Sequence, residues 1–435
     1  MSVDPWPAVR VESTARALTA YGGAVLLRDV MRVLRIVEEV DACVGLKRRA
    51  RGLSEGQFVS AIAESIALGA TCLDDFAVNR ADVAQEQLRG FPVPAPQTAG
   101  SFLRRFSLGH IHQLNKALVA IQRRAYVAAG AREVTLDFDS TYVFSRSNRR
   151  QGVDRTYKKG YALHPLLCFD AVSGAAVHAR LRRGRSGPST GIGTFVTEAL
   201  RRVPDGVAVR ARFDSGFYSA SLFDQLDAAG ATYLCGVPLV PRVLEAVRAV
   251  SDTCFAACLD KDEGEVAEFG YRLAGGGPFR RYVVKRIEIE PGEQASLETG
   301  GYRYWVFVTN DHHRSPAELE SEHRHKADVE AGMRELKSNF GLGTIRKHGF
   351  MANWVWLLLV CLGHNLCRWV QQLGRLAPGR DGTEHRAKRL RYRFLVVPAL
   401  VVRSGRRLSI KLPATYPNTT AFLRARHTIL RHHPT

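Results

Sequence analysis

The order of strand-like and helix-like segments between residues 133 and 237 limits the folds open to this chain more than any other feature. Residues that favour β-structure fill five segments, at 134–138, 162–169, 175–181, 207–213 and 232–237. Helical patterns occupy residues 190–202 and 219–229, so the order along the chain is β-β-β-α-β-α-β. Strands and helices in this order predict an α/β unit built on an open sheet.

Two of these strands run directly into an aspartate. Asp139 follows the first strand and opens the sequence Asp-Ser-Thr, and Asp214 follows the fourth and opens Asp-Ser-Gly. Functional sites of open sheets form where the carboxyl ends of strands bring side chains together. Because Mg²⁺ and Mn²⁺ prefer carboxylate and water oxygens, the two acids predict a site for such ions. Asp137 is an alternative first acid, since residues two apart on a strand face the same way.

A third acid is expected on a helix predicted from Ser315 to Phe340, with Pro316 in its first turn. One helical stripe is apolar and consists of Val329, Met333, Leu336 and Phe340. A second stripe, also at helical spacing, consists of His323, Lys326, Glu330, Arg334 and Lys337. Glu330 is the carboxylate of that stripe and is flanked by basic residues. The alternative interpretation is a solvated face with salt bridges between successive turns.

The rest of the sequence predicts the domain organisation. Residues 1–130 have helical patterns at 25–44, 58–68 and 111–129, and we expect them to form an all-helical DNA-binding domain, with a plain helical bundle as the alternative. Residues 131–370 form the predicted α/β domain, which an insertion rich in short strands interrupts at about 240–300. Residues 371–435 form a basic C-terminal region.

The charge of the chain indicates a polyanionic partner. Lys and Arg total 62 against 42 Asp and Glu, which gives a net charge of +20 and a pI near 10.0. Nucleic acid is the first candidate, because phosphates bound by basic residues release counterions. No membrane partner is expected, since the apolar run at 354–362 is too short to span a bilayer and is typical of a buried helix. The spacing of Cys361, His364 and Cys367 could suggest zinc, but their apolar neighbours favour the same buried helix.

At this point the chain resembles the bacterial insertion-sequence transposases of the Asp-Asp-Glu (DDE) class. Four segments carry the resemblance: LDFDSTYVF at 136–144, GYALHPLLCFD at 160–170, VRARFDSGFYS at 209–219, and YRYWVFVTND followed by HRHKADVEAGMRELKSNFG within 302–341. The resemblance implies a ribonuclease H-like catalytic domain with a β-rich insertion before its last helix. It also places the first catalytic acid directly before Ser-Thr, which favours Asp139 over Asp137.

The family has a Tyr-Arg-Glu-Lys signature on its last helix. The matching positions here are His323, Lys326, Glu330 and Lys337, so the glutamate and the lysine agree and the first two residues depart. A lysine can keep the basic role at position 326, although without the bidentate phosphate contacts of arginine.

The resemblance implies a DNA transposase whose Asp139, Asp214 and Glu330 hold two Mg²⁺ or Mn²⁺ ions. Lys326, Lys337, His323 and Arg334 are then the expected DNA-binding residues. The expected partners are double-stranded DNA, as terminal inverted repeats and as target, and a second copy of the chain on that DNA. The expected location is the cytoplasm, in association with the nucleoid. The alternatives are a ribonuclease H-like nuclease that does not join strands, and a catalytically silent DNA-binding protein descended from a transposase.

Overall fold

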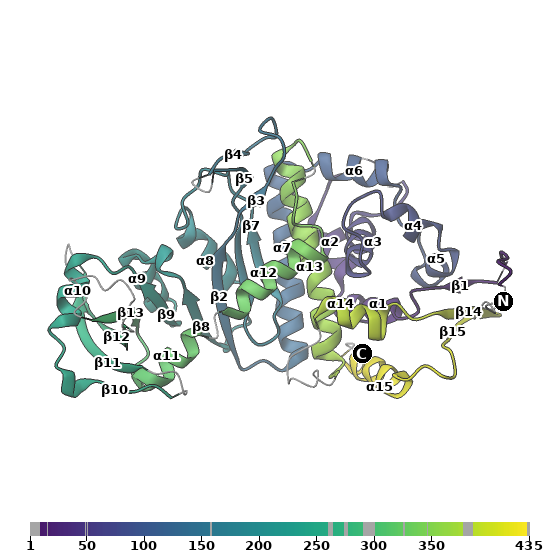
Figure 1. The fold of residues 1–435 in the computed structure, drawn as a ribbon. Helices are drawn as coiled ribbons and strands as arrows, with labels where there is room; N and C mark the ends of the chain where they lie inside the picture. The colour runs from purple at the N-terminus through teal and green to yellow at the C-terminus, as the bar shows by residue number, and fades with distance from the viewer. Residues whose placement is uncertain are drawn as a thin grey trace, which may run out of the picture.

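The structure is a computed structural model that describes residues 9–14, 16–47, 49, 51–156, 159–259, 264–273, 277–289, 301–324, 327–345, 347–376 and 386–432. Among these residues, a mixed sheet of nine strands forms one half of the molecule, and helices form the other (Figure 1). The strands lie in the order β10 (Ala256–Ala257), β11 (Glu265–Arg272), β12 (Phe279–Glu288), β13 (Tyr302–Thr309), β9 (Thr232–Val237), β8 (Ala208–Phe213), β2 (Glu133–Ser140), β6 (Leu166–Asp170) and β7 (Ala176–Arg180).

The directions of these strands follow the predicted order of segments. β2 pairs in parallel with β8, and β8 pairs in parallel with β9. The neighbours on either side, β6 and β7 at one edge and β10 to β13 at the other, run antiparallel. The five predicted strands and the two predicted helices, α8 (Ile192–Leu200) and α9 (Ala220–Ala228), are present in the expected order.

The single strand predicted at 162–169 is wrong in one respect, because Pro165 divides it. Proline lacks the N–H that a sheet ladder requires. The first half is β5 (Tyr161–Leu163), which pairs with β3 (Val143–Phe144) and β4 (Asp154–Arg155) in a separate small sheet. The second half is β6, which pairs with β2 in the large sheet.

The two faces of the large sheet pack against different helices. Successive side chains of a strand point to opposite faces. Leu136 and Phe138 of β2 belong to the apolar core that includes α8 and α9. On the opposite face, Phe169 of β6 packs in a core with α12 (Ala327–Asn339) and α13 (Phe350–Leu373). Asp137 and Asp139 alternate with Leu136 and Phe138, so both acids point to the α12 side.

The predicted insertion at 240–300 extends the sheet. It opens with α10 (Pro241–Arg248) and η2 (Asp252–Cys254), and then supplies β10, β11 and β12. β12 pairs along its whole length with β13, which in turn pairs with β9, so the added strands β10 to β12 lie beyond β13 at this edge of the sheet. The strands expected here were short, but β11 has 8 residues and β12 has 10.

The N-terminal part is helical, as predicted. Its helices are α1 (Ala24–Val33), α2 (Ile36–Cys43), α3 (Glu55–Ala67), α4 (Phe76–Ala81), α5 (Val83–Arg89), α6 (Pro96–Arg104) and α7 (Leu108–Ala129). Ser54 and Gln57 form a capping box that starts α3. The single helix predicted at 25–44 is wrong, because Arg35 has a left-handed backbone (φ 54°) that separates α1 from α2.

Helix α13 is the buried helix that the apolar run predicted. By length and composition it could cross a membrane, but 83% of its most apolar window is buried inside the protein. Its Cys361, His364 and Cys367 are buried, and His364 contacts Glu335 of α12. In the described part of the chain, no group of three His, Cys, Asp or Glu side chains is placed to hold a metal ion.

The C-terminal residues return to the N-terminal helices. They form α14 (Ala387–Leu390), the π-helix η3 (Arg391–Leu395), β14 (Ala399–Ser404), β15 (Arg407–Lys411) and α15 (Thr419–Arg431). β14 pairs with β1 (Leu18–Thr19), and α15 packs on α1 and α13. One apolar core therefore contains side chains from the N-terminal helices, α12, α13 and α15.

The helix predicted from Ser315 to Phe340 is helical in the two parts that the structure describes, α11 (Pro316–Arg324) and α12. α11 packs on β11 and β12, whereas α12 packs on α13 and α14. Figure 1 shows α11 beside the added strands and α12 beside the helical half. Residues 325 and 326 between the two helices, including Lys326 of the predicted DNA-binding set, lie outside the described residues.

Candidate active site

The register of β2 and β8 places the two strand-end acids at the same level. Asp137 lies opposite Arg212 in the parallel ladder. Asp139 and Asp214 each follow two residues later, so both acids reach the same edge of the sheet. They line one cavity of about 260 Å³, together with Ser140, Thr141, Tyr142, Phe144, His164, Pro188, Gly216, Phe217 and Lys337.

The local chain at each acid explains how it is held. Asp139 is the last but one residue of β2, and its Oδ1 accepts a hydrogen bond of 2.6 Å from the backbone N–H of Ser140. Asp214 follows β8 and precedes the short helix η1 (Ser215–Phe217), and its backbone carbonyl accepts a hydrogen bond from the N–H of Phe217. Gly236 of β9 lies close to Ser215, where a Cβ atom would come within 3.0 Å of the Ser215 nitrogen.

Asp137 has a different environment from Asp139. Its side chain is completely buried and accepts two hydrogen bonds from Arg212, of 2.5 Å from Nε and 2.6 Å from Nη2. Arg212 also donates a hydrogen bond of 2.8 Å from Nη1 to the backbone carbonyl of Glu322 in α11. This buried pair connects β2, β8 and the last turn of α11 directly behind the two cavity acids.

Lys337 is brought to the cavity from α12. Its Nζ donates a hydrogen bond of 2.5 Å to the hydroxyl of Thr141, two residues after Asp139. The cavity therefore combines two carboxylates with an ammonium group. A cation beside carboxylates can contact the phosphate oxygens of a substrate that the acids act on.

His164 in the cavity wall is buried, and both of its ring nitrogens form hydrogen bonds. Its Nδ1 lies 2.8 Å from the carbonyl oxygen of Ser186, and its Nε2 lies 3.0 Å from the hydroxyl of Ser140. A carbonyl can only accept, so Nδ1 carries the proton and donates. The ring also stacks on Tyr142 with centroids 4.1 Å apart. His164 thus helps to shape the cavity wall next to Asp139.

The remaining predicted site residues lie apart from the cavity lining. Glu330 and Arg334 are exposed on α12, and neither lines the cavity. His323 lies at the end of α11, where its ring packs on Phe307 with centroids 4.2 Å apart. The structure thus brings Asp139, Asp214 and Lys337 together and leaves Glu330, Arg334 and His323 outside this group.

Sequence reasoning missed the Asp137–Arg212 pair and the roles of Ser140 and Thr141. A signal for the pair was available, because Asp137 and Arg212 are charged residues in the middle of strands that are otherwise apolar. Buried charges are almost always paired. The partner could not be assigned, because the two residues are 75 positions apart in the sequence.

The donor set of the cavity fits a hard divalent cation in part. Asp139 and Asp214 supply carboxylate oxygens on one wall, the ligand type that Mg²⁺ and Mn²⁺ prefer. A third carboxylate must come from another element, and α12 reaches the cavity through Lys337. Glu330 lies seven residues before Lys337, which is two helical turns and nearly the same face of α12.

The fold and this cavity define an α/β protein with a carboxylate site at the carboxyl ends of two parallel strands. The family model described as transposase DDE domain group 1 matches residues 2–434, and the chain therefore belongs to the DDE transposase family.

Among solved structures, the chain is similar to a piggyBac transposase in a synaptic complex with hairpin DNA. The identity is 14%, the match covers 87% of this chain and 81% of that chain, and the TM-score is 0.44. No curated protein matches the chain.

Proposed function

We propose that this chain is a DNA transposase that cuts DNA at the ends of a mobile element and joins the cut ends to target DNA. The observation that carries the proposal is the shared cavity of Asp139 and Asp214 in a chain of the DDE family. Glu330 is the proposed third acid. Asp137 is not proposed as a ligand, because both of its oxygens are bonded to Arg212.

The strand order supports a ribonuclease H-like catalytic core. From the edge inward, β7, β6 and β2 are antiparallel neighbours, and β2, β8 and β9 follow in parallel. That is the order expected of the core implied by the resemblance. The same resemblance supports membership of the bacterial insertion-sequence group and the assignment of His323, Lys326, Glu330 and Lys337 to its last-helix signature.

Glu330 reaches the site through α12 in this proposal. It shares a helical face with Lys337, whose ammonium already contacts Thr141 in the cavity. Its exposed position in the structure means that completing the site requires α12 to move or turn toward Asp139 and Asp214. Attraction between three carboxylates and divalent cations favours that movement, since the acids alone repel one another.

Each residue of the site has a distinct part in the proposed reaction. Asp139, Asp214 and Glu330 would hold two Mg²⁺ or Mn²⁺ ions. Such ions, when bound, supply the charge that activates a nucleophile and stabilises the leaving oxygen of a phosphodiester. Lys337 is placed to bind a non-bridging phosphate oxygen beside the acids. Arg334 and Lys326 are proposed to contact the adjacent DNA backbone. His164 orients Ser140 and so fixes the wall next to Asp139.

The proposed partners are element-end and target DNA, with a second copy of the chain assembled on the paired ends. The C-terminal region supports a DNA partner, because residues 385–435 contain no Asp or Glu and twelve Lys or Arg residues. Residues 1–130 and 371–435 are proposed as DNA-binding regions around a catalytic region at 131–370. Their shared core means that they position DNA as parts of one body. A nucleoid-associated location in the cytoplasm follows from these partners.

The test is a strand cleavage and joining assay. Purified protein is incubated with Mg²⁺, a labelled duplex that carries the inverted repeats flanking its own gene, and a target plasmid. The proposal predicts cleaved and joined products with the wild type and neither product with Asp214→Asn, while that variant still binds DNA. Cleavage without joining would instead establish a nuclease, and binding without cleavage by the wild type a silent DNA-binding protein.

A further inference from the structure

β14 and β15 form a hairpin whose outer half is a two-stranded ribbon. The strands pair as far as Ser404 and Arg407, and the two residues between these form the turn. In the described part of the chain, the one other strand of this sheet is β1, which pairs with Ala399 and Leu400 at the base of the hairpin. Figure 1 shows the hairpin extending away from the helical half, at the opposite side of the molecule from α10.

The tip of this hairpin is slender and open to solvent. Gly405 and Arg406 make the turn, and Gly405 has the left-handed backbone (φ 58°) that two-residue hairpin turns favour. Beyond its chain neighbours, no described atom lies within 4 Å of the position that a Cβ atom would take on Gly405. All residues from Arg403 to Ser409 are exposed. The tip is therefore accessible from both faces of the ribbon.

This tip carries positive charge that the protein itself does not neutralise. Arg403, Arg406 and Arg407 lie close together in the sequence, and Lys411 follows on β15. Among the residues that the structure describes, none of these four side chains forms an ion pair or a hydrogen bond. Residues 385–435 contain no Asp or Glu that could approach them from the same region. Such a cluster of cations attracts a polyanion.

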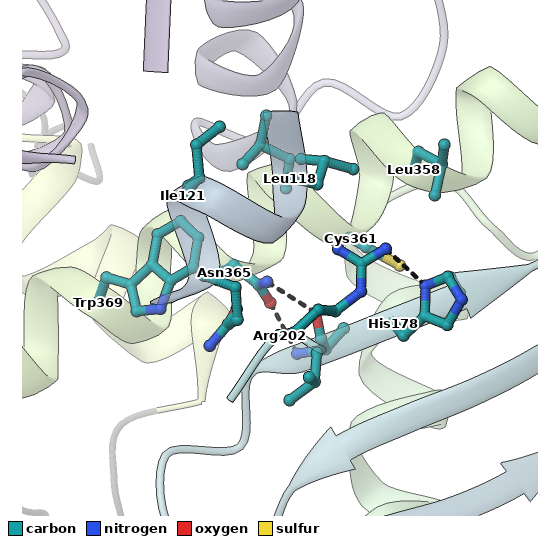
Figure 2. A pocket seen from close by; sticks show the side chains of 13 residues that line it. Leu118, Ile121, His178, Arg202, Leu358, Cys361, Asn365 and Trp369 are labelled. Carbon is teal, nitrogen blue, oxygen red and sulfur yellow. Dashed lines mark hydrogen bonds between the residues drawn. The ribbon is translucent and has the colours of Figure 1, made fainter. Parts of the chain in front are cut away.

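Buried arginines of this chain have a different environment. Figure 2 shows Arg202 between the sheet and α13, where its Nη2 donates to Nδ1 of His178 at 2.8 Å. Arg212 is bonded to Asp137 in the interior. Those guanidinium groups stabilise the fold, whereas the guanidinium groups at the hairpin tip are available to an external anion.

The register distributes the cations over both faces of the ribbon. Arg403 lies opposite Leu408, and Ser404 lies opposite Arg407. Because neighbouring residues of a strand point to opposite faces, Arg403 projects from one face and Arg407 from the other. Lys411 lies four residues beyond Arg407 and on the same face. A ribbon with cations on both faces suits a channel that has phosphates along both walls.

The major groove of duplex DNA is such a channel. It is about 12 Å wide, admits a two-stranded β-ribbon, and has a phosphate backbone on each side. The minor groove, at about 6 Å, is too narrow for the ribbon. The major groove of an RNA duplex is deep and narrow, so the shape of the hairpin favours DNA.

We propose that the β14–β15 hairpin enters the major groove of duplex DNA. Arg403 and Arg407 contact the phosphates on the two sides of the groove. Arg406 at the tip faces the base edges, where arginine binds N7 and O6 of guanine. The inference rests on the proposed function for its partner, and it adds the element and the groove through which the C-terminal region binds.

Binding affinity tests the phosphate contacts. Arg403→Gln/Arg407→Gln removes two charges from the hairpin, and the matched control Arg242→Gln/Arg248→Gln removes two exposed charges from α10. With the labelled inverted-repeat duplex and no divalent cation, the hairpin variant should bind about tenfold or more weakly, and the slope of log affinity against log salt should fall by about 2. The α10 variant should match the wild type in both measurements. Equal losses in the two variants would overturn the proposal.

Dimethyl sulfate footprinting tests the groove, because this reagent methylates guanine N7, which faces the major groove. The wild type should protect guanines of the bound duplex, and Arg406→Ala should lose protection at one group of neighbouring guanines only. A wild-type complex without protected guanines, or unchanged protection with Arg406→Ala, would overturn the proposal even if the other hairpin variant fails to fold. Wild-type protein that does not bind the duplex would also contradict the proposed function, whereas unchanged footprints with a protein that cleaves and joins DNA would contradict the hairpin assignment alone.

Discussion

Two aspartates on one strand have different roles because of what lies beside each of them. Asp137 and Asp139 point to the same face of the sheet, two residues apart. Asp137 is level with Arg212 and is sealed in a bidentate ion pair. Asp139 lies beyond the end of that ladder and opens onto the cavity that it shares with Asp214. Asp137 therefore stabilises the fold, and Asp139 lines the cavity in which the proposed chemistry takes place.

Substituting these two acids should separate stability from activity. Asp137→Asn leaves the buried Arg212 without its counter-charge, so we expect the free energy of unfolding to fall by about 3–5 kcal/mol. Asp139→Asn should leave that free energy nearly unchanged and abolish DNA cleavage. Urea denaturation and the cleavage assay measure the two effects. A stable, inactive Asp137→Asn together with an active Asp139→Asn would reverse the assignment.

At the level of single residues, the sequence predicts what lies along one strand better than what lies between strands. Asp139 and Asp214 could be selected because each directly follows an apolar strand, and strand direction then brings both to one edge. The pairing of Asp137 with Arg212 and the contact of Lys337 with Thr141 depend on side chains 75 and 196 positions apart. Local sequence patterns contain no information on which side chains pair across such separations in the sequence.

Among the elements, α11 and α12 carry the residues on both sides of the proposed third acid, Glu330. Helical periodicity predicts one helix from Ser315 to Phe340, and its apolar stripe from Val329 to Phe340 lies in the part that contains α12. It could not predict that α11 packs on the added strands while α12 packs on α13. A hydrogen bond connects the last turn of α11 to the sheet, because Arg212 of β8 donates to the Glu322 carbonyl. A cation at the carboxyl end of a helix also stabilises the helix dipole.

The hydrogen bond between Arg212 and α11 should affect how DNA cleavage depends on the Mg²⁺ concentration. In the double variant Asp137→Leu/Arg212→Met, both charges are removed together, so no unpaired charge remains. The Glu322 carbonyl then loses the hydrogen bond from Arg212, so the position of α11, which precedes Glu330 in the chain, is less restricted. We expect the Mg²⁺ concentration for half-maximal cleavage to rise by about tenfold or more, with DNA affinity unchanged. The same Mg²⁺ dependence in the variant and the wild type would show that the pair does not position the third acid.

A buried carboxylate in the helical half predicts how stability depends on pH. Glu64 of α3 accepts hydrogen bonds from Arg28 of α1 and Arg89 of α5. Burial alone would raise the pKa of Glu64, but the two guanidinium groups outweigh it and hold the pKa at about 2. Because the folded pKa lies below the ordinary 4.5, the ionised form stabilises the fold above pH 4.5, and this contribution is lost as the pH falls toward 2.

Glu64→Gln is the variant that tests this linkage. It should be less stable than the wild type at pH 7, and its stability should change less between pH 4.5 and pH 2. Urea denaturation at several pH values gives the comparison. Parallel curves for the two proteins across that range would mean that Glu64 titrates normally in the folded state.

For the whole molecule, the N-terminal and C-terminal segments pack together and contribute side chains to one hydrophobic core. β1 pairs with β14, and the N-terminal helices share a core with α13 and α15. The sequence predicted the helical start, the α/β middle and the basic end as consecutive parts. It could not predict that the first and last parts pack together, because they are more than 300 residues apart, as the contact of Ala67 with Arg391 illustrates.

The C-terminal helix should therefore contribute to global stability. Phe422 of α15 is 1% exposed in the shared core, and its neighbour Leu423 is 57% exposed. Phe422→Ala should lower the free energy of unfolding by about 3–5 kcal/mol, whereas Leu423→Ala should change it little. Thermal unfolding checks both variants. Equal effects, or loss of DNA binding without loss of stability in Phe422→Ala, would indicate that α15 is a separate DNA-binding appendage.

Glu330 is proposed to complete a metal site with Asp139 and Asp214, and metal rescue tests this role most directly. A thiolate binds Mn²⁺ better than it binds Mg²⁺. With Glu330→Cys, we predict cleavage reduced by about 100-fold in Mg²⁺ and restored by about tenfold or more in Mn²⁺, while Glu330→Ala stays inactive in both ions. Wild-type activity of Glu330→Cys in Mg²⁺, or equal loss in Mn²⁺ for the two variants, would contradict a metal-binding role for Glu330.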